Sequence, residues 1–234
     1  MISDLLARSL PLLRRRAGTL DLSALHEVGP RALGVDSLAV SLLTDPGRRE
    51  LLWSSDALGR RFEDLEFVLG DGPGDDASSH GRPVLVPDLA GTRSARWPML
   101  AAEATALPVR AVFCFPLCIG AIHLGTLTAV RRTSGPLTGA QTDDAFVLAA
   151  ALTSLCLEVP DGDGHLPWEE EPPPLLRAVV HQATGMLSVQ LAVPLPEALV
   201  RLRAHAYAAG RTLGDMAQDI VDRRARLGQN GREE

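Results

Sequence analysis

The sequence contains no lysine, and all 23 of its basic residues are arginines. This is typical of GC-rich coding sequence. Aromatic side chains are also few, at 4% of the 234 residues. Only three cysteines are present, an odd number, and the N-terminal residues lack the basic and apolar blocks of an export signal. We therefore expect free thiols and a cytoplasmic protein rather than a disulfide framework.

Long apolar runs are missing as well. The longest, AFVLAAALTSLCL at 145–157, is interrupted by Thr153 and Ser154 and is too short to span a bilayer. Hydrophobic residues make up 46% of the chain and charged residues 22%, which is ordinary for a globular protein with a real core. His80 and His123 stand without a neighbouring nucleophile, so no catalytic constellation is visible and we expect no enzyme.

Two motifs resemble ligand-binding sites, but their composition argues against ligand binding. GDGPGDD at 70–76 lacks the lysine and hydroxyl of a phosphate loop, and its three aspartates would repel phosphate. A turn leading into a helix is expected there. Cys114 and Cys118 lie four residues apart, but structural zinc requires four ligands, and no CxxC or HxxxH pair accompanies them. We expect core thiols, with no metal and no cofactor.

Charge divides the chain unevenly. Residues 1–174 contain 15 arginines and 23 acidic residues, which give a net charge of −8. Residues 175–234 contain 8 arginines and 6 acidic residues, which give a net charge of +2. Between the two parts, VPDGDGHLPWEEEPPP at 159–174 has five prolines and five acidic residues, and it can neither continue a helix nor fill a core. We predict a domain over 1–158, a stiff linker over 159–174 and a second domain over 175–234.

The first part alternates strand and helix signals, which predicts an α+β domain with an antiparallel sheet. Helical spacing is expected at 2–18, 22–33 and 138–159. Short β-rich runs lie at 36–44, 50–54 and 83–87, and a buried hairpin over 109–119 and 121–132 turns near Gly120.

Five short motifs follow one another in this part: FVLGDGP at 67–73, PVLVPDL at 83–89, RWP at 96–98, FPL at 115–117 and LGTLTAVR at 124–131. Their order and spacing are similar to those of GAF sensor domains. The resemblance covers roughly residues 20–158. It implies a sheet of about six strands with packed helices, and a small-molecule or protein signal as partner, without identifying that signal.

The second part opens with an amphipathic helix over 175–191 that carries a glycine in its middle. A helical wheel gathers Leu176, Val179, Val180, Ala183, Leu187 and Leu191 on one apolar stripe, with Arg177, His181, Thr184, Gly185 and Ser188 opposite. A glycine in a helix interior costs about 1 kcal/mol relative to alanine. Because Gly185 is on the polar face, we infer that something outside the helix approaches its backbone.

Two further short helices are expected after it. Pro196 suits a first helical turn and Gly210 a helix stop. TLGD at 212–215 is a variant capping box that opens a third helix, with Met216, Ile220 and Val221 facing inward.

The segments LLRAVVHQATGMLSVQL and PEALVRLRAHAYAAGRTLGDMAQDIV resemble an ANTAR domain, the three-helix RNA-binding module of bacterial transcription antiterminators. The resemblance covers 175–227. It implies an RNA partner, paired stem-loops in nascent transcripts, whose antiterminator structure the protein would stabilise. Many members carry a lysine where Thr184 stands, so strong phosphate attraction is not implied there. The RNA-binding residues that it implies are His181, Thr184, Gly185, Ser188, Arg203, His205, Tyr207 and Arg211.

Other interpretations stay open. Binding two stem-loops is easiest with two modules, and the apolar helix over 140–158 offers a dimer element, so a homodimer is expected. The C-terminal helices could instead serve mainly for dimerisation in a ligand-sensing or protein-docking module that binds no RNA. DNA binding by a helix-turn-helix is weaker, because the third helix carries Asp215, Asp219 and Asp222, which would repel phosphate.

Overall fold

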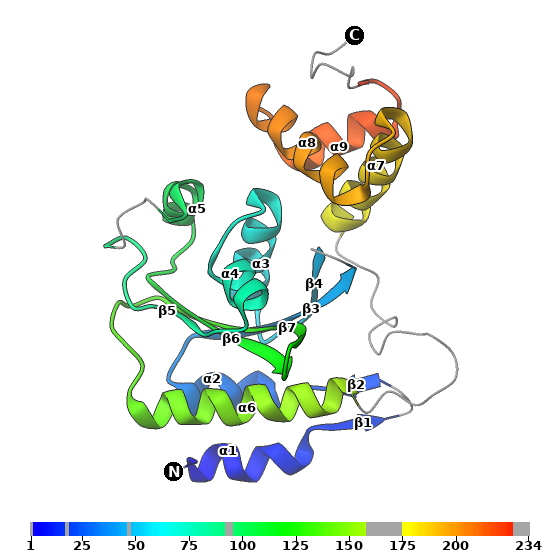
Figure 1. Ribbon diagram of the computed structural model, residues 1–234. Helices are drawn as coiled ribbons and strands as arrows, with labels where there is room; N and C mark the ends of the chain where they lie inside the picture. The colour runs from blue at the N-terminus through cyan, green and yellow to red at the C-terminus, as the bar shows by residue number, and fades with distance from the viewer. Residues whose placement is uncertain (1, 17–18, 46–47, 92–95, 158–174, 227–234) are drawn as a thin grey trace. The chain divides into compact units, whose positions relative to one another are not determined.

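The computed structural model describes residues 2–16, 19–45, 48–91, 96–157 and 175–226 (Figure 1). The chain divides into two compact units, Met1–Trp168 and Glu169–Glu234. The predicted linker over 159–174 lies outside the described residues.

The N-terminal unit is built on a five-stranded antiparallel sheet with the strand order β4-β3-β7-β6-β5. Its strands are β3 (Ser37–Asp45), β4 (Arg48–Ser54), β5 (Val84–Val86), β6 (Ala111–Ile119) and β7 (Ile122–Arg131). Gly120, with φ +54°, allows the tight turn between β6 and β7, which confirms the predicted hairpin. The short strand β5 pairs only with β6, so it forms one edge of the sheet.

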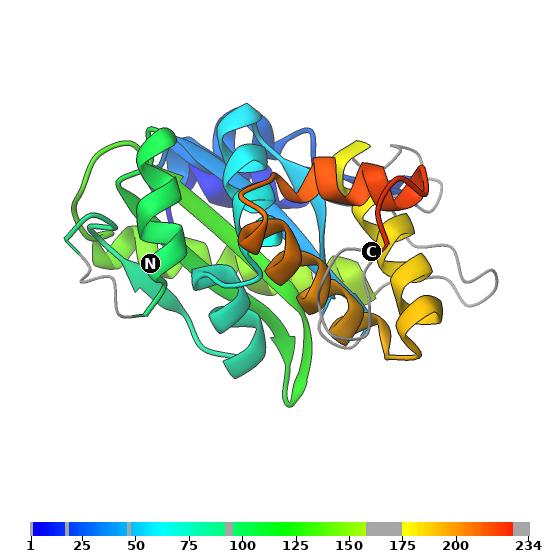
Figure 2. The same ribbon diagram turned by 90° about the horizontal axis from the view of Figure 1, so that it is seen from above.

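Helices cover both faces of this sheet (Figures 1 and 2). On one face lie α2 (Leu25–Leu33) and α6 (Gly139–Leu157), with α1 (Asp4–Ser9) packed on α2. On the other lie α3 (Ala57–Leu69), α4 (Pro73–His80) and α5 (Pro98–Glu103), the last continued by a 3₁₀ turn, η2 (Ala104–Ala106). Each face buries its own apolar core, so the predicted α+β class is confirmed.

Local signals set the ends of α3 and α4. The side chain of Asp56 accepts hydrogen bonds from the backbone N–H groups of Leu58 and Gly59, which caps the start of α3. Gly70 ends α3 in the left-handed conformation. Pro73 then occupies the first turn of α4. The GDGPGDD segment is thus a turn leading into a helix, as predicted.

Two expectations for the N-terminal unit are corrected. The helix expected over 2–18 ends at Ser9, because Pro11 has no N–H to donate to the carbonyl of Ala7, and a 3₁₀ turn, η1 (Leu10–Leu12), follows. The next residues form two short paired strands, β1 (Arg14–Arg16) and β2 (Thr19–Asp21). The main sheet has five strands rather than about six, since β1 and β2 pair only with each other.

The C-terminal unit contains α7 (Leu175–Leu191), α8 (Leu195–Ala208) and α9 (Leu213–Val221), as expected for three short helices. The Thr212 hydroxyl accepts a hydrogen bond from the Asp215 N–H at 3.1 Å, which confirms the predicted cap of α9. Met216 and Ile220 are buried as predicted, whereas Val221 is only half-buried. Helix α7 packs against both α8 and α9, and this double contact holds the unit together.

No single helix within the described ranges is long and apolar enough to cross a membrane. Helices α7 and α8 meet that test only when joined across their bend of 106°.

Candidate nucleic-acid interface and the cavity beside β5

The polar face predicted for α7 is partly wrong. Arg177 and Thr184 are buried, with 1% and 3% of their surface exposed. The Thr184 hydroxyl donates a hydrogen bond to the carbonyl of Val180 at 2.7 Å, within its own helix. The wheel predicted one apolar stripe, whereas α7 packs against two helices, and the buried sector therefore extends into the expected polar face.

The other three α7 residues of the predicted interface are half-buried. Ser188 fastens the end of the helix, because its hydroxyl donates to the Val193 carbonyl at 2.6 Å and its own carbonyl accepts from the Val193 N–H at 3.1 Å. Gly185 behaves differently. A Cβ added there would meet no atom within 4 Å, so this position faces open space. His181 lies one turn before it on α7.

The predicted residues of α8 and its C-terminal end do not form one cluster. Arg203 and His205 are both half-buried, and two residues on a helix are about 200° apart, so they flank opposite sides of the buried face. Tyr207 is 71% exposed. Arg211 donates a hydrogen bond to Asp219 at 2.5 Å, which balances its charge within the unit.

Gly185 instead lines a hollow of about 560 Å³ between α7 and the segment that follows α9. Met186, Val189 and Gln190 of α7 form the rest of one wall. The opposite wall consists of Ile220, Arg223, Ala225 and Arg226. The sequence analysis missed Arg223 and Arg226, although the basic run VDRRAR was a signal for them.

The chain reverses after α9 through a C-terminal cap that normally uses glycine. The N–H groups of Arg223 and Arg224 donate to the carbonyls of Ile220 and Asp219, at 3.0 and 2.7 Å. Arg223 takes the left-handed conformation, with φ +59°, in the place where glycine is common. Arg223 therefore holds a backbone conformation that costs about 1 kcal/mol or more for a residue with a Cβ.

At this end of α9, Arg224 forms ion pairs with acidic residues, whereas Arg223 and Arg226 line the hollow. Arg224 pairs with Asp219 and Asp222 at 2.8 Å each. Hydrogen bonds from Arg211 and Arg224 hold the pKa of Asp219 below its usual value. Arg223 and Arg226 make no ion pair with any other described residue. The hollow is thus lined by positive charge, while Asp219 and Asp222 are already paired.

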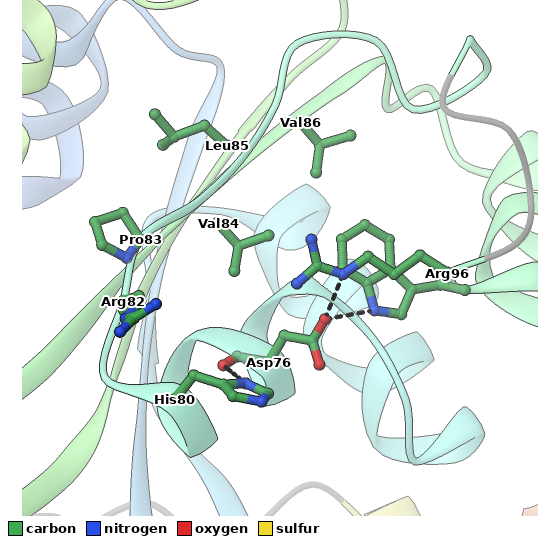
Figure 3. Close-up of a pocket in the computed structure, with 9 residues that line it drawn as sticks. Asp76, His80, Arg82, Pro83, Val84, Leu85, Val86 and Arg96 are labelled. Atoms are coloured by element: carbon green, nitrogen blue, oxygen red, sulfur yellow. Dashed lines mark hydrogen bonds and ion pairs between the residues drawn. The ribbon is translucent and has the colours of Figure 1, made fainter.

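A cavity of about 600 Å³ lies in the N-terminal unit beside the edge strand β5 (Figure 3). Asp76 of α4 accepts hydrogen bonds from Arg96 Nε at 2.9 Å and from Trp97 Nε1 at 3.1 Å, and the Arg96 guanidinium lies 4.7 Å from the Trp97 ring. Exposed His80 and Arg82 also line the cavity. The lining thus contains two guanidinium groups and one carboxylate, and the carboxylate is paired with Arg96. The remaining lining residues are Pro83, Val84, Leu85 and Val86.

Beneath α3 and α4 the interior holds a buried charge cluster. Arg49 of β4 lies 2.6 Å from Glu66, 3.6 Å from Glu63 and 3.5 Å from Asp75. Three carboxylates therefore share one guanidinium. Glu63 also accepts a hydrogen bond from the Ser41 hydroxyl at 2.5 Å. Burial raises the pKa of Glu66 to about 7, because the charged carboxylate loses its hydration there and lies near two other acids.

The cysteines show no arrangement for metal binding within the described part of the chain. Cys114 is fully buried, and its Sγ lies 3.9 Å from the Thr128 hydroxyl oxygen, whereas Cys118 is half-buried. Burial raises the pKa of the Cys114 thiol, which makes it a poor nucleophile. No group of three His, Cys, Asp or Glu side chains among the described residues could hold a metal ion.

Comparisons with known proteins agree with this division. Residues 176–221 match the family model for the ANTAR domain, so the C-terminal unit is an ANTAR domain. No curated protein matched the chain.

Several solved GAF domains are similar to the chain. The GAF domain of a phosphoenolpyruvate-protein phosphotransferase from Coxiella burnetii is 16% identical with a TM-score of 0.45, covering 57% of this chain and 78% of that one. The GAF domain of the phosphoenolpyruvate-protein phosphotransferase from Acinetobacter is 14% identical with a TM-score of 0.47, and the match covers 66% of this chain and 94% of that one. A GAF domain/HD domain protein from Geobacter sulfurreducens is 16% identical with a TM-score of 0.43, and the match covers 60% of this chain and 94% of that one.

Proposed function

We propose that this protein is a cytoplasmic transcription antitermination regulator, in which the GAF-like unit is the sensor and the ANTAR domain is the RNA-binding output. It acts without catalysis, by stabilising an antiterminator stem-loop in a nascent transcript so that polymerase reads through. The observation that carries this proposal is the ANTAR match over residues 176–221, since this family binds RNA. The arginines beside Gly185 support it, because RNA binding depends on neutralising phosphate charge.

The RNA interface that we propose keeps most of the predicted residues. Gly185, His181, Arg203 and Tyr207 have accessible surface to offer an RNA. Ser188 and Arg211 are already engaged in hydrogen bonds within the unit, so they contribute less, whereas His205 is as accessible as Arg203 and is kept. We leave out Thr184, because its side chain is buried and its hydroxyl is bonded within α7.

The signal that we propose for the sensor is an anion bound at the cavity beside β5. Its volume of about 600 Å³ falls in the range of about 300–1,000 Å³ common for small-molecule sites. Arg82 supplies positive charge, and Arg96, which is paired with Asp76 at 2.9 Å, supplies a second guanidinium group. Apolar side chains of β5 line the same cavity, so the anion would carry an apolar body rather than being a bare inorganic ion.

We also propose that the protein acts as a homodimer, which would present two ANTAR domains to paired stem-loops. Helix α6 supports this because Phe146, Val147 and Leu157 are each more than a third exposed on its outer surface. An apolar helix face of this kind is a common dimer contact.

Single-round transcription through an intrinsic terminator preceded by two stem-loops tests the proposed function. Adding the full chain should raise the read-through fraction, and scrambling the two stem-loop sequences while keeping the terminator should remove the effect. If the protein left read-through unchanged on both templates, antitermination would be ruled out and a docking module would be the better account.

A further inference from the structure

We propose that the hollow beside Gly185 holds one unpaired nucleotide of an RNA loop, with its base against Met186 and Val189 and its phosphate at Arg223 and Arg226. This inference rests on the proposed RNA-binding function and assigns the site within it. Arg223 and Arg226 lie beyond the residues that match the ANTAR model, 176–221, and neither is among the RNA-binding residues that the resemblance implies.

The missing side chain at Gly185 is the first observation. Glycine is the poorest helix former after proline, yet it stands in the middle of the 17-residue helix α7. Tight packing within the unit does not explain it, because a Cβ would meet nothing within 4 Å. Gly185 lines the hollow, so its missing side chain leaves more of that space open to a group from outside the unit.

The charge of the lining is the second observation. Other exposed arginines of this unit are committed to acids: Arg201 lies 2.5 Å from Glu197, and Arg224 pairs with Asp219 and Asp222. The two arginines of the hollow have no such partner among the described residues. Guanidinium groups of this kind suit binding a phosphate or stacking on a base.

The backbone at Arg223 is the third observation. Its left-handed conformation is one that a glycine would adopt without strain. A strained backbone that places a charged side chain at a cavity is typical of a functional site rather than of a helix end selected only for stability.

The apolar wall identifies the ligand as a base and not only a phosphate. Val189 is 85% exposed, and Met186 lies beside it on the wall of the hollow. A flexible thioether and an aliphatic side chain next to guanidinium planes offer a surface on which a base can stack. Bases inside a duplex are stacked on their neighbours and cannot enter, whereas loop bases can be splayed out.

Three substitutions test the site in the full chain, each with an expected effect on RNA affinity. Gly185→Leu fills the hollow with an uncharged, strongly helix-forming side chain, so affinity for a stem-loop RNA should fall about tenfold or more while the helix is retained. Arg223→Gly and Arg226→Gln should each weaken binding. Each should also reduce the slope of log affinity against log salt by about 0.7, the value for one single-strand phosphate contact.

Two control variants separate these effects from general ones. Ala192 also has a left-handed backbone, with φ +53°, so Ala192→Gly relieves the same kind of strain as Arg223→Gly without removing a charge. Arg201→Gln removes an exposed arginine that is paired with Glu197 and does not line the hollow. Both controls should bind RNA within about twofold of the unaltered chain. The thermal midpoint of Arg223→Gly should not fall, as glycine suits that backbone.

An abasic scan of the RNA loop locates the nucleotide. Removing one particular loop base should weaken binding to the unaltered chain about tenfold, with no further loss in Gly185→Leu, because both changes remove the same contact. Affinity equal to that of the unaltered chain in all three hollow variants, or additive losses in the scan, would overturn the inference. If the unaltered chain bound no stem-loop RNA, the proposed function would fail and the inference with it.

Discussion

The backbone N–H of Gly74 donates a hydrogen bond to Glu66 at 2.8 Å, while Arg49 holds the other oxygen of the same carboxylate at 2.6 Å. The glycine-rich turn before α4 thus receives an anion, but that anion is a side chain of the protein itself. A Cβ at Gly72 or Gly74 would overlap Glu66 or Arg49. The glycines in this motif therefore allow α4 to pack on a buried charge cluster, and they do not form a phosphate site.

Protonation of Glu66 should make stability depend on pH. Its pKa is raised from 4.5 to about 7 in the folded protein, so the folded state keeps a proton that the unfolded state has already lost. Stability is full below about pH 4.5 and falls as pH rises through 7, by on the order of 3 kcal/mol in total. Urea unfolding of the unaltered chain and of Glu66→Gln at about pH 5 and pH 8 measures this. The pH-dependent loss should be much smaller in Glu66→Gln, and an equal loss in both would show that Glu66 does not titrate in this range.

Gly74→Ala should destabilise the N-terminal unit by about 1–3 kcal/mol, although alanine is the better helix former. The new Cβ would force Arg49 away from the buried carboxylates. Gly139→Ala is the matched control, because a Cβ at Gly139, the first residue of α6, meets nothing within 4 Å. Denaturant midpoints of the two variants should move in opposite directions. If Gly74→Ala left the denaturant midpoint unchanged, the turn would have space for the added Cβ, and the prediction would be wrong.

Thr184→Val should leave RNA affinity within about twofold of the unaltered chain, since the side chain is buried and its hydroxyl is bonded to Val180. Fluorescence anisotropy with a labelled stem-loop RNA measures the affinity, and circular dichroism checks that α7 is intact. A loss of about tenfold in the folded variant would return Thr184 to the interface.

Anion binding beside β5 can be tested with inorganic phosphate as the probe. Phosphate should raise the thermal midpoint of the unaltered chain more than sodium chloride at the same ionic strength does, because it binds only the folded state. Most of this shift should disappear in Arg82→Gln and Arg96→Gln. Arg110→Gln is the control, because Arg110 is an exposed arginine paired with Asp88 at 3.2 Å and lies outside the cavity. Equal shifts in all four proteins would argue against a site here.

Strong local signals made the C-terminal unit predictable. The periodicity of α7, the Thr212 cap and Gly210 are each local features, and all three helices formed as expected. Helix α3 was not predicted, even though Asp56 caps its start and Gly70 ends it in the left-handed conformation.

Tertiary packing explains what the sequence could not predict. A wheel of α7 cannot show that two helices pack on it, so the burial of Arg177 and Thr184 was not visible. The approach of Arg223 and Arg226 to Gly185 joins residues about 40 positions apart and depends on how the chain reverses after α9. The outward-facing glycine was visible in the sequence, but the side chains that surround it were not.

The most direct measurement is the affinity of the full chain for a two-stem-loop RNA, compared with duplex DNA of equal length, across a range of salt concentrations. We expect the RNA to bind at least about tenfold more tightly at each salt concentration, since unpaired loop bases are available only in the RNA. Affinity for both should fall as salt rises. Equal binding of RNA and DNA, or no binding of either, would contradict an RNA-binding output domain.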